Sequence, residues 1–176
     1  MDDPADVETR FGLGLARNVQ RLVPHNPLWA TAFEGEVARF QPALAPVALA
    51  VEHYGSSAVP GLAAKPIIDI QVGVARIEDA LELIAPMAAL GYDDAGSQGI
   101  PDHRIFGRGV RRTFLVHIVP FGSEQWWRGL RFRDRLRADA ALRAEYQQLK
   151  EALIASTATR AAYTAGKAAF VARVSA

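Results

Sequence analysis

The residues best suited to chemistry lie in one stretch, residues 51–74, with the sequence VEHYGSSAVPGLAAKPIIDIQVGV. Gly55, Ser56 and Ser57 close an apolar, strand-like run, and Asp69 stands thirteen residues past Ser56 in the next such run. Glycine lets the backbone approach a ligand closely, and consecutive N–H groups with hydroxyls can hold phosphate oxygens. The spacing returns the second strand beside the first, so the hydroxyls and the carboxylate are expected at one sheet edge. The pattern predicts a phosphate and metal site.

The orientation of Asp69 follows from the alternation of side chains along a strand. Asp69 and Gln71 point the same way, away from a predicted core of Ile68, Ile70, Val72 and Val74. A carboxylate at such a position costs free energy unless it is solvated, paired or bound to a cation. Two interpretations stay open: Asp69 accepts hydrogen bonds from the loop at residues 55–57, or it belongs to a ligand site.

Three basic residues outside the turn are candidates to bind the same phosphate. Lys65 immediately precedes the second strand, although a solvated loop lysine is an equally good interpretation. Lys167 lies on the last predicted helix and can point a positive charge at the cleft. Arg104 can clamp a phosphate bidentately, or it forms an ion pair with Asp102 or Asp134.

The elements that must position these residues alternate between helices and strands. The sequence predicts helices over residues 28–40 and 77–90, strands over 46–54, 67–74, 104–106 and 112–120, a loop over 92–103, and three C-terminal helices capped by Ser123, Asp139 and Thr159. Pro42 is expected to end or disrupt the first helix. The order predicts an α/β (α+β) fold, a mixed β-sheet with helices packed on it and a helical C-terminal part.

Length and composition limit the class of protein. The 176 residues suit one domain over 21–176, preceded by a flexible N-terminal arm over 1–20. The chain has no cysteine and no apolar run long enough to cross a bilayer, and its acidic N-terminus lacks a signal peptide pattern. We therefore expect a cytoplasmic protein without a membrane partner. A net charge of +1 argues against nucleic acid as the main partner, and the basic segment 128–137 is interpreted as a solvated helix face.

Five segments carry a family resemblance over residues 22–174: LVPHNPLW, EHYGSSAVPGLAAKPIIDIQV, GSEQWWRGLRFRDRLRAD, EYQQLK and YTAGKAAFV. With them the chain resembles the GrpB family, also called UPF0157, which is similar to nucleotidyltransferases of the DNA polymerase beta type. The resemblance implies a nucleotidyltransferase-like fold and a nucleotide or other phosphorylated small molecule as partner.

The resemblance also implies roles for individual residues. Gly55 and Ser56 match the phosphate-contacting turn, and Asp69 matches the first carboxylate that binds Mg²⁺ and serves catalysis. The second metal position holds the neutral Gln71, and the later strand offers His117 where a third carboxylate is expected. Imidazole is a poor magnesium ligand but binds transition metals.

Two further positions match family motifs. Arg133 lies in the Phe-Arg-Asp motif, where the resemblance implies that it binds the ligand or braces the helical part against the site. Lys167 ends the Tyr-Thr-x-Gly-Lys motif. Three functions therefore stay open. One is ligand binding with magnesium-dependent nucleotidyl transfer. The second is a non-catalytic nucleotide-binding or regulatory module that has lost the second metal carboxylate at Gln71. The third is a structural or interaction domain without a ligand.

Overall fold

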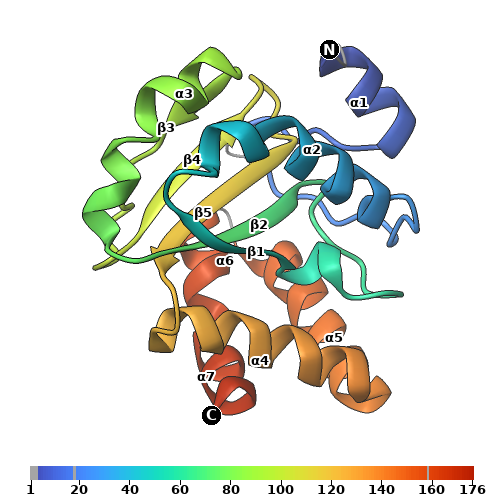
Figure 1. Cartoon of the computed structure of the whole chain (residues 1–176). Coiled ribbons are helices and arrows are strands. Elements are labelled where there is room, and N and C mark those ends of the chain that lie inside the picture. The colour runs from blue at the N-terminus through green and yellow to red at the C-terminus, as the bar shows by residue number, and fades with distance from the viewer. Residues whose placement is uncertain (1–3, 18, 158) are drawn as a thin grey trace.

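A five-stranded mixed sheet forms the centre of the protein (Figure 1). This computed structural model describes residues 4–17, 19–157 and 159–176. The strand order is β1-β2-β5-β4-β3, in which β2 and β5 are parallel and the other neighbours antiparallel. The strands are β1 (Ala48–Tyr54), β2 (Ile68–Val74), β3 (Tyr92–Asp94), β4 (Arg104–Arg108) and β5 (Phe114–Pro120). The predicted mixed α/β architecture is confirmed.

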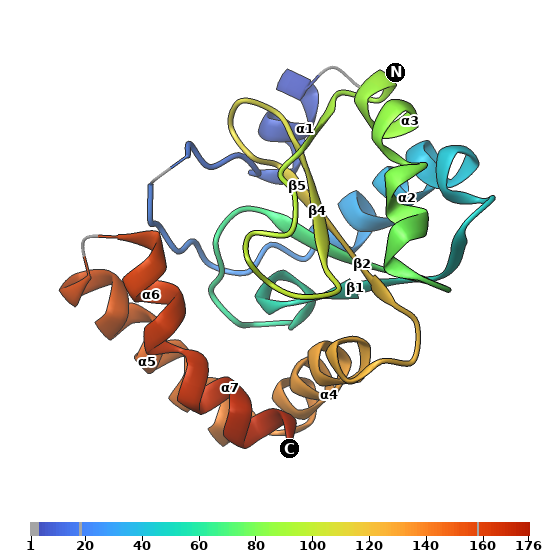
Figure 2. The same ribbon diagram turned by 90° about the vertical axis from the view of Figure 1, so that its left-hand side faces the viewer.

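Helices cover the sheet from two sides, as Figures 1 and 2 show. On one side lie α1 (Pro4–Phe11), α2 (Trp29–Leu44) and α3 (Ile84–Ala89), and on the other α4 (Glu124–Ala138), α5 (Ala140–Ser156), α6 (Arg160–Gly166) and α7 (Ala168–Ser175). The aliphatic residues of β2 are fully buried in the main core together with residues of α1, α2 and α3, as alternation predicts: Ile68, Ile70, Val72 and Val74. A second core joins the C-terminal helices to the loop after β1 through Val59, Leu62, Phe132, Tyr146 and Phe170. None of the described helices is both long and apolar enough to span a bilayer.

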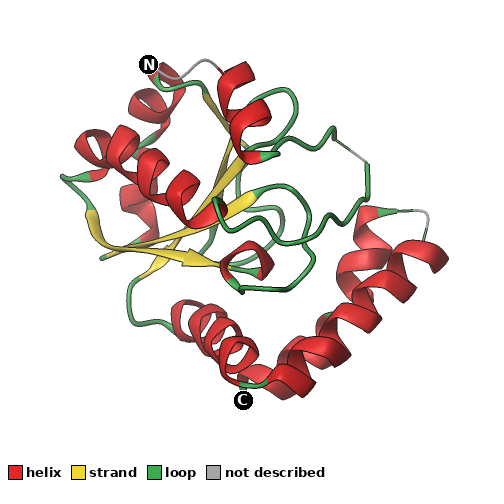
Figure 3. Cartoon of the chain, turned by 90° about the vertical axis from the view of Figure 1, so that its right-hand side faces the viewer, coloured by secondary structure: helices red, strands yellow, loops and turns green. Residues whose placement is uncertain are grey.

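The C-terminal helices begin where the sequence predicts. Ser123, Asp139 and Thr159 each accept a hydrogen bond from a backbone N–H three residues later, which satisfies one free donor of the first turn. The last predicted helix is divided in two, because α6 ends at Gly166 and α7 begins at Ala168 (Figure 3). Lys167 stands at this junction, which brings its side chain close to the start of β2.

Three local predictions are wrong for identifiable reasons. The helix expected over 77–90 forms instead as a 3₁₀ turn, η2 (Ile77–Leu81), followed by α3, because Pro86 lacks the N–H that a continuous helix needs and is tolerated only in a first turn. Pro42 does not end α2, which continues to the buried Leu44. The loop predicted over 92–103 contains β3, which is too short for an alternation pattern to reveal.

The described part of residues 1–20 contains regular structure where we expected a flexible arm. Val7 and Phe11 of α1, and Leu13 after it, are buried in the main core. The Trp29 indole N–H donates to the Phe11 carbonyl at 3.0 Å, which ties this segment to α2. With so few apolar residues the sequence shows little periodicity here, although Val7, Phe11, Leu13 and Leu15 are all buried.

Candidate functional site

The turn after β1 and the carboxylate on β2 meet at one sheet edge, as their spacing predicts. Tyr54, the last residue of β1, pairs with Asp69 of β2, and the chain then turns at Gly55 into a short 3₁₀ turn, η1 (Ser56–Ala58). Gly55 has φ +72°, and a Cβ there would lie 2.9 Å from Asp69 Oδ2. Glycine is therefore required both for the backbone conformation and for the close approach of the carboxylate.

A pocket of about 80 Å³ opens beside this turn, and we call it the lysine pocket. Its polar lining includes Ser56, Lys65, Asp69, Lys150, Tyr163 and Lys167. The chain has only three lysines among its 20 lysines and arginines, and all three line this pocket. Asp69 is the one carboxylate among its described lining residues, so the lining carries more positive than negative charge.

Lys150, on α5, is the lysine that sequence reasoning missed. It is 1% exposed, and its Nζ donates to the Ala63 carbonyl and, at 3.4 Å, to Ser56 Oγ. Burial, together with a smaller effect of the nearby charge of Lys167, lowers the pKa of Lys150 to about 7. The signals in the sequence were the scarcity of lysine and the position of Lys150 one helical turn after Tyr146.

Lys65 and Lys167 approach the pocket from segments far apart in the sequence, the loop before β2 and the junction of α6 and α7. Both ammonium groups lie over the ring of Tyr163. Burial lowers the pKa of Lys167 to about 8, with a smaller contribution from the charge of Lys65. Burial and the charge of Arg160 also lower the pKa of Lys65. Within the described ranges, none of the three lysines forms an ion pair with a carboxylate. Lys65 is partly buried and contacts Tyr163, so the solvated-loop interpretation does not describe its surroundings.

Asp69 keeps its carboxylate open to a ligand. Its side chain is 31% exposed, and no hydrogen bond within the described part of the chain reaches it, so the interpretation in which it pins the turn is not supported. His117 Nε2 lies 3.5 Å from Asp69 Oδ1. On its other side, His117 Nδ1 lies 3.1 Å from His103 Nε2. Burial lowers the pKa of His103 to about 4, with His117 adding to the effect.

His103 is a second residue that the sequence did not reveal, because its loop position suggested a surface residue. It is only 9% exposed. Ser57 lines the lysine pocket but is buried. Its hydroxyl oxygen lies 3.1 Å from His53 Nε2. The Ser57 side chain therefore faces His53, whereas the more exposed Ser56 faces Lys150.

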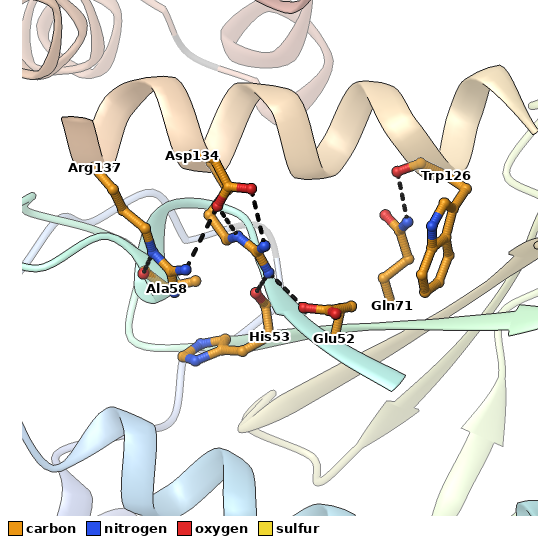
Figure 4. A network of polar contacts seen from close by, with 8 residues as sticks. Glu52, His53, Ala58, Gln71, Trp126, Asp134 and Arg137 are labelled. Atoms are coloured by element: carbon orange, nitrogen blue, oxygen red, sulfur yellow. Dashed lines mark hydrogen bonds and ion pairs between the residues drawn. The ribbon is translucent and has the colours of Figure 1, made fainter. Parts of the chain in front are cut away.

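Gln71 and Arg133 join the sheet to α4 instead of lining the lysine pocket. Figure 4 shows the Gln71 side chain directed at the Trp126 carbonyl of α4. Gln71 is 2% exposed, and its Nε2 donates to the Trp126 carbonyl at 3.0 Å. Arg133 donates through one nitrogen to Glu52 Oε2 at 2.7 Å and to the His53 carbonyl at 2.8 Å, and through Nε to Asp134. Arg133 thus braces the helical part against β1, one of the two roles expected for it.

Arg104 also lies outside the lining of the lysine pocket. Its guanidinium binds Asp94 on β3 through two hydrogen bonds, of which the Nε–Oδ1 distance is 3.0 Å. An ion pair was one of the two interpretations, but its partner is Asp94 and not Asp102 or Asp134. The pairing follows from β3, the strand that the sequence did not reveal.

The donor set of the pocket differs from that expected for magnesium. No group of three or more His, Cys, Asp or Glu side chains within the described ranges is arranged to hold a metal ion. Mg²⁺ prefers carboxylate and water oxygens, whereas this pocket offers one carboxylate and three lysines. The lining is therefore better matched to an anion than to a two-metal centre.

A family model described as GrpB protein matches residues 20–176. The chain belongs to the GrpB family. A GrpB protein of Enterococcus faecalis with a solved crystal structure is 35% identical, with a TM-score of 0.80 over 88% of this chain and 94% of that chain. The UPF0157 protein YqkA of Bacillus subtilis is 38% identical over 146 residues, which cover 82% of this chain and 42% of YqkA.

Some relatives of this GrpB family member carry the name of an enzyme, dephospho-CoA kinase. A dephospho-CoA kinase of Mycolicibacterium paratuberculosis is 33% identical over 162 residues, which cover 77% of this chain and 40% of the kinase. The chain thus spans less than half the length of this kinase and of YqkA.

Proposed function

We propose that this GrpB family member binds a phosphorylated small molecule, with a nucleotide as the leading candidate, through the lysine pocket. The observation that carries the proposal is the convergence of the chain's three lysines on one pocket with Ser56 and a single carboxylate. Elsewhere the chain uses arginine for its positive charges. Lysines clustered without carboxylate partners repel one another, and an anion relieves that repulsion.

Phosphate is the anion best matched to the pocket. Hydrogen bonds between ammonium groups and phosphate oxygens are charge-assisted and stronger than neutral ones. The volume of about 80 Å³ is larger than the roughly 30 Å³ that a water molecule occupies in the liquid, and it suits one phosphoryl group. Ser56 adds a hydroxyl whose described partner, Lys150, would face the same phosphate.

The proposal is tested by calorimetric titration with inorganic phosphate, tripolyphosphate, ATP, coenzyme A and dephospho-CoA. The last two are included because of the relative named dephospho-CoA kinase. Lys167→Met is expected to weaken binding roughly tenfold to a hundredfold, because a hydrogen bond to a charged group contributes about 1.5–3 kcal/mol.

Arg173→Met is the matched control, since it removes one positive charge from an exposed pair with Glu145, away from the lysine pocket. Equal affinities of Lys167→Met and Arg173→Met for every anion would overturn the proposal. The absence of binding to all five compounds would also overturn it.

A second candidate, magnesium-dependent nucleotidyl transfer, is favoured by the exposed carboxylate of Asp69 beside the lysines. Asp69 would hold a magnesium ion together with the phosphates of the ligand, and His117 lies within reach of the same carboxylate. Titrations of ATP with and without Mg²⁺ separate the two candidates. Binding that requires the metal and is lost in Asp69→Asn supports transfer, whereas metal-independent binding supports a binding module.

A further inference from the structure

A second hollow adjoins the lysine pocket, and we call it the helical groove. It has a volume of about 430 Å³ and lies between α4 and the face of α6 and α7. Its lining includes Glu124 and Arg128 from α4, with Lys167, Ala168, Val171 and Ala172 opposite. Lys167 lines both hollows, so they meet at this residue.

The helical groove has the composition of a site for an organic group. Its floor is apolar, formed by Ala168, Val171 and Ala172, and its volume falls within the roughly 300–1,000 Å³ of small-molecule sites. Arg128 is exposed, and its side chain forms no ion pair or hydrogen bond with any residue that the structure describes. A free guanidinium can stack on an aromatic ring or bind an oxygen of a ligand.

The length of the helical groove also matches a ligand larger than phosphate. An α-helix rises about 1.5 Å per residue, so the face from Lys167 to Ser175 extends roughly 12 Å from the lysine pocket. The lysine pocket alone, at about 80 Å³, has no room for a sugar and a base.

We propose that the helical groove binds the organic part of the ligand, a nucleoside-like group with a flat heterocycle, whose terminal phosphate lies in the lysine pocket. This inference rests on the proposed function and adds the class of ligand, an organic phosphate ester. Lys167 stands at the junction, where it contacts the phosphate end. The apolar floor faces the heterocycle, and Arg128 covers it from α4.

The test compares ATP with tripolyphosphate, which share a triphosphate and differ by the nucleoside. Wild-type protein is expected to bind ATP at least about tenfold more tightly. Ala172→Trp fills the helical groove and is expected to abolish that advantage while leaving the affinity for tripolyphosphate unchanged. Ala169→Trp is the control, because Ala169 is exposed on the same helix and does not line the helical groove.

Arg128→Met is a second variant that leaves the packing of α7 intact. It is expected to weaken ATP but not tripolyphosphate. Equal affinities of wild-type protein for the two probes overturn the inference, as do Ala172→Trp and Arg128→Met variants that bind ATP as wild type does. With either outcome, binding of tripolyphosphate to the wild-type protein would still support the proposed function. Failure of both probes to bind wild-type protein would also overturn the inference, and failure of all five compounds of the panel would remove the proposed function with it.

Discussion

Lys65 and Lys167 hold their ammonium nitrogens over the same aromatic ring, that of Tyr163, each 4.4 Å from the ring centroid. Two like charges that share one ring repel each other, and the negative face of the ring compensates part of that repulsion. The arrangement keeps two cations at the entrance to a pocket that already contains Lys150. Tyr163 is therefore a positioning residue for the positive charge of the lysine pocket.

Removal of the ring at position 163 should weaken both folding and anion binding. Tyr163 is 2% exposed, and each cation–π contact contributes about 0.5–2 kcal/mol. Tyr163→Leu is expected to lower the free energy of unfolding by about 1–3 kcal/mol and to weaken tripolyphosphate binding. Tyr163→Phe keeps the ring and should behave as wild type in urea unfolding and calorimetry. A Tyr163→Phe variant that loses as much affinity as Tyr163→Leu would show that the hydroxyl, not the ring, is responsible.

Lys150 should make stability depend on pH in the alkaline range. Its pKa is about 7 in the folded protein and about 10.4 in an unfolded chain, so between these values the unfolded state binds more protons. The free energy of unfolding contributed by Lys150 is therefore lowest below pH 7 and rises as the pH increases toward 10, by at most about 1.4 kcal/mol per pH unit. Urea unfolding of wild type and Lys150→Met between pH 6.5 and 9.5 measures this effect. The difference between the two proteins should change with pH, and a constant difference would contradict the shifted pKa.

The turn should not tolerate a side chain at Gly55. Gly55→Ala places a methyl group 2.9 Å from Asp69 Oδ2 on a backbone with φ +72°. Gly61 has φ +77° with nothing within 4 Å of the added carbon, so Gly61→Ala measures backbone strain alone. We expect Gly55→Ala to cost about 1–3 kcal/mol more than Gly61→Ala in urea unfolding. Adding Asp69→Ala should recover part of that difference, and an unchanged penalty would place the conflict elsewhere.

The sequence predicts the parts of this protein that depend on local chemistry. The inward residues of β2, the caps at Ser123 and Asp139, and the meeting of Gly55 with Asp69 follow from alternation, side-chain hydrogen bonding and loop length. The lysine pocket depends on contacts between segments far apart in the chain. Lys150 projects from α5 into the loop before β2, and its position one helical turn after Tyr146 does not by itself distinguish it from a solvated helical lysine.

The polar residues that we assigned to the ligand were predicted less well than the fold, because their partners come from distant elements. Gln71 lies on the predicted side of β2, but α4 covers that part of the strand and takes its amide as a partner. Arg104 pairs with Asp94 because β3 exists, and a strand of three residues gives no detectable period. A residue type at a family position therefore predicts the neighbourhood of a site more reliably than the contact it makes.

Substitution of Arg133 tests whether this residue supports the fold or binds the ligand. It is 8% exposed and connects α4 to Glu52 and to the His53 carbonyl, so Arg133→Met leaves a buried acceptor and part of a carboxylate without their partner. We expect a loss of about 2–4 kcal/mol in the free energy of unfolding, with unchanged affinity of the folded protein for tripolyphosphate. Arg104→Met, which breaks a more exposed pair, should cost about 0–1 kcal/mol. If Arg133→Met instead keeps wild-type stability and loses tripolyphosphate binding, Arg133 contacts the ligand directly, and the anion site must extend past the lysine pocket toward α4.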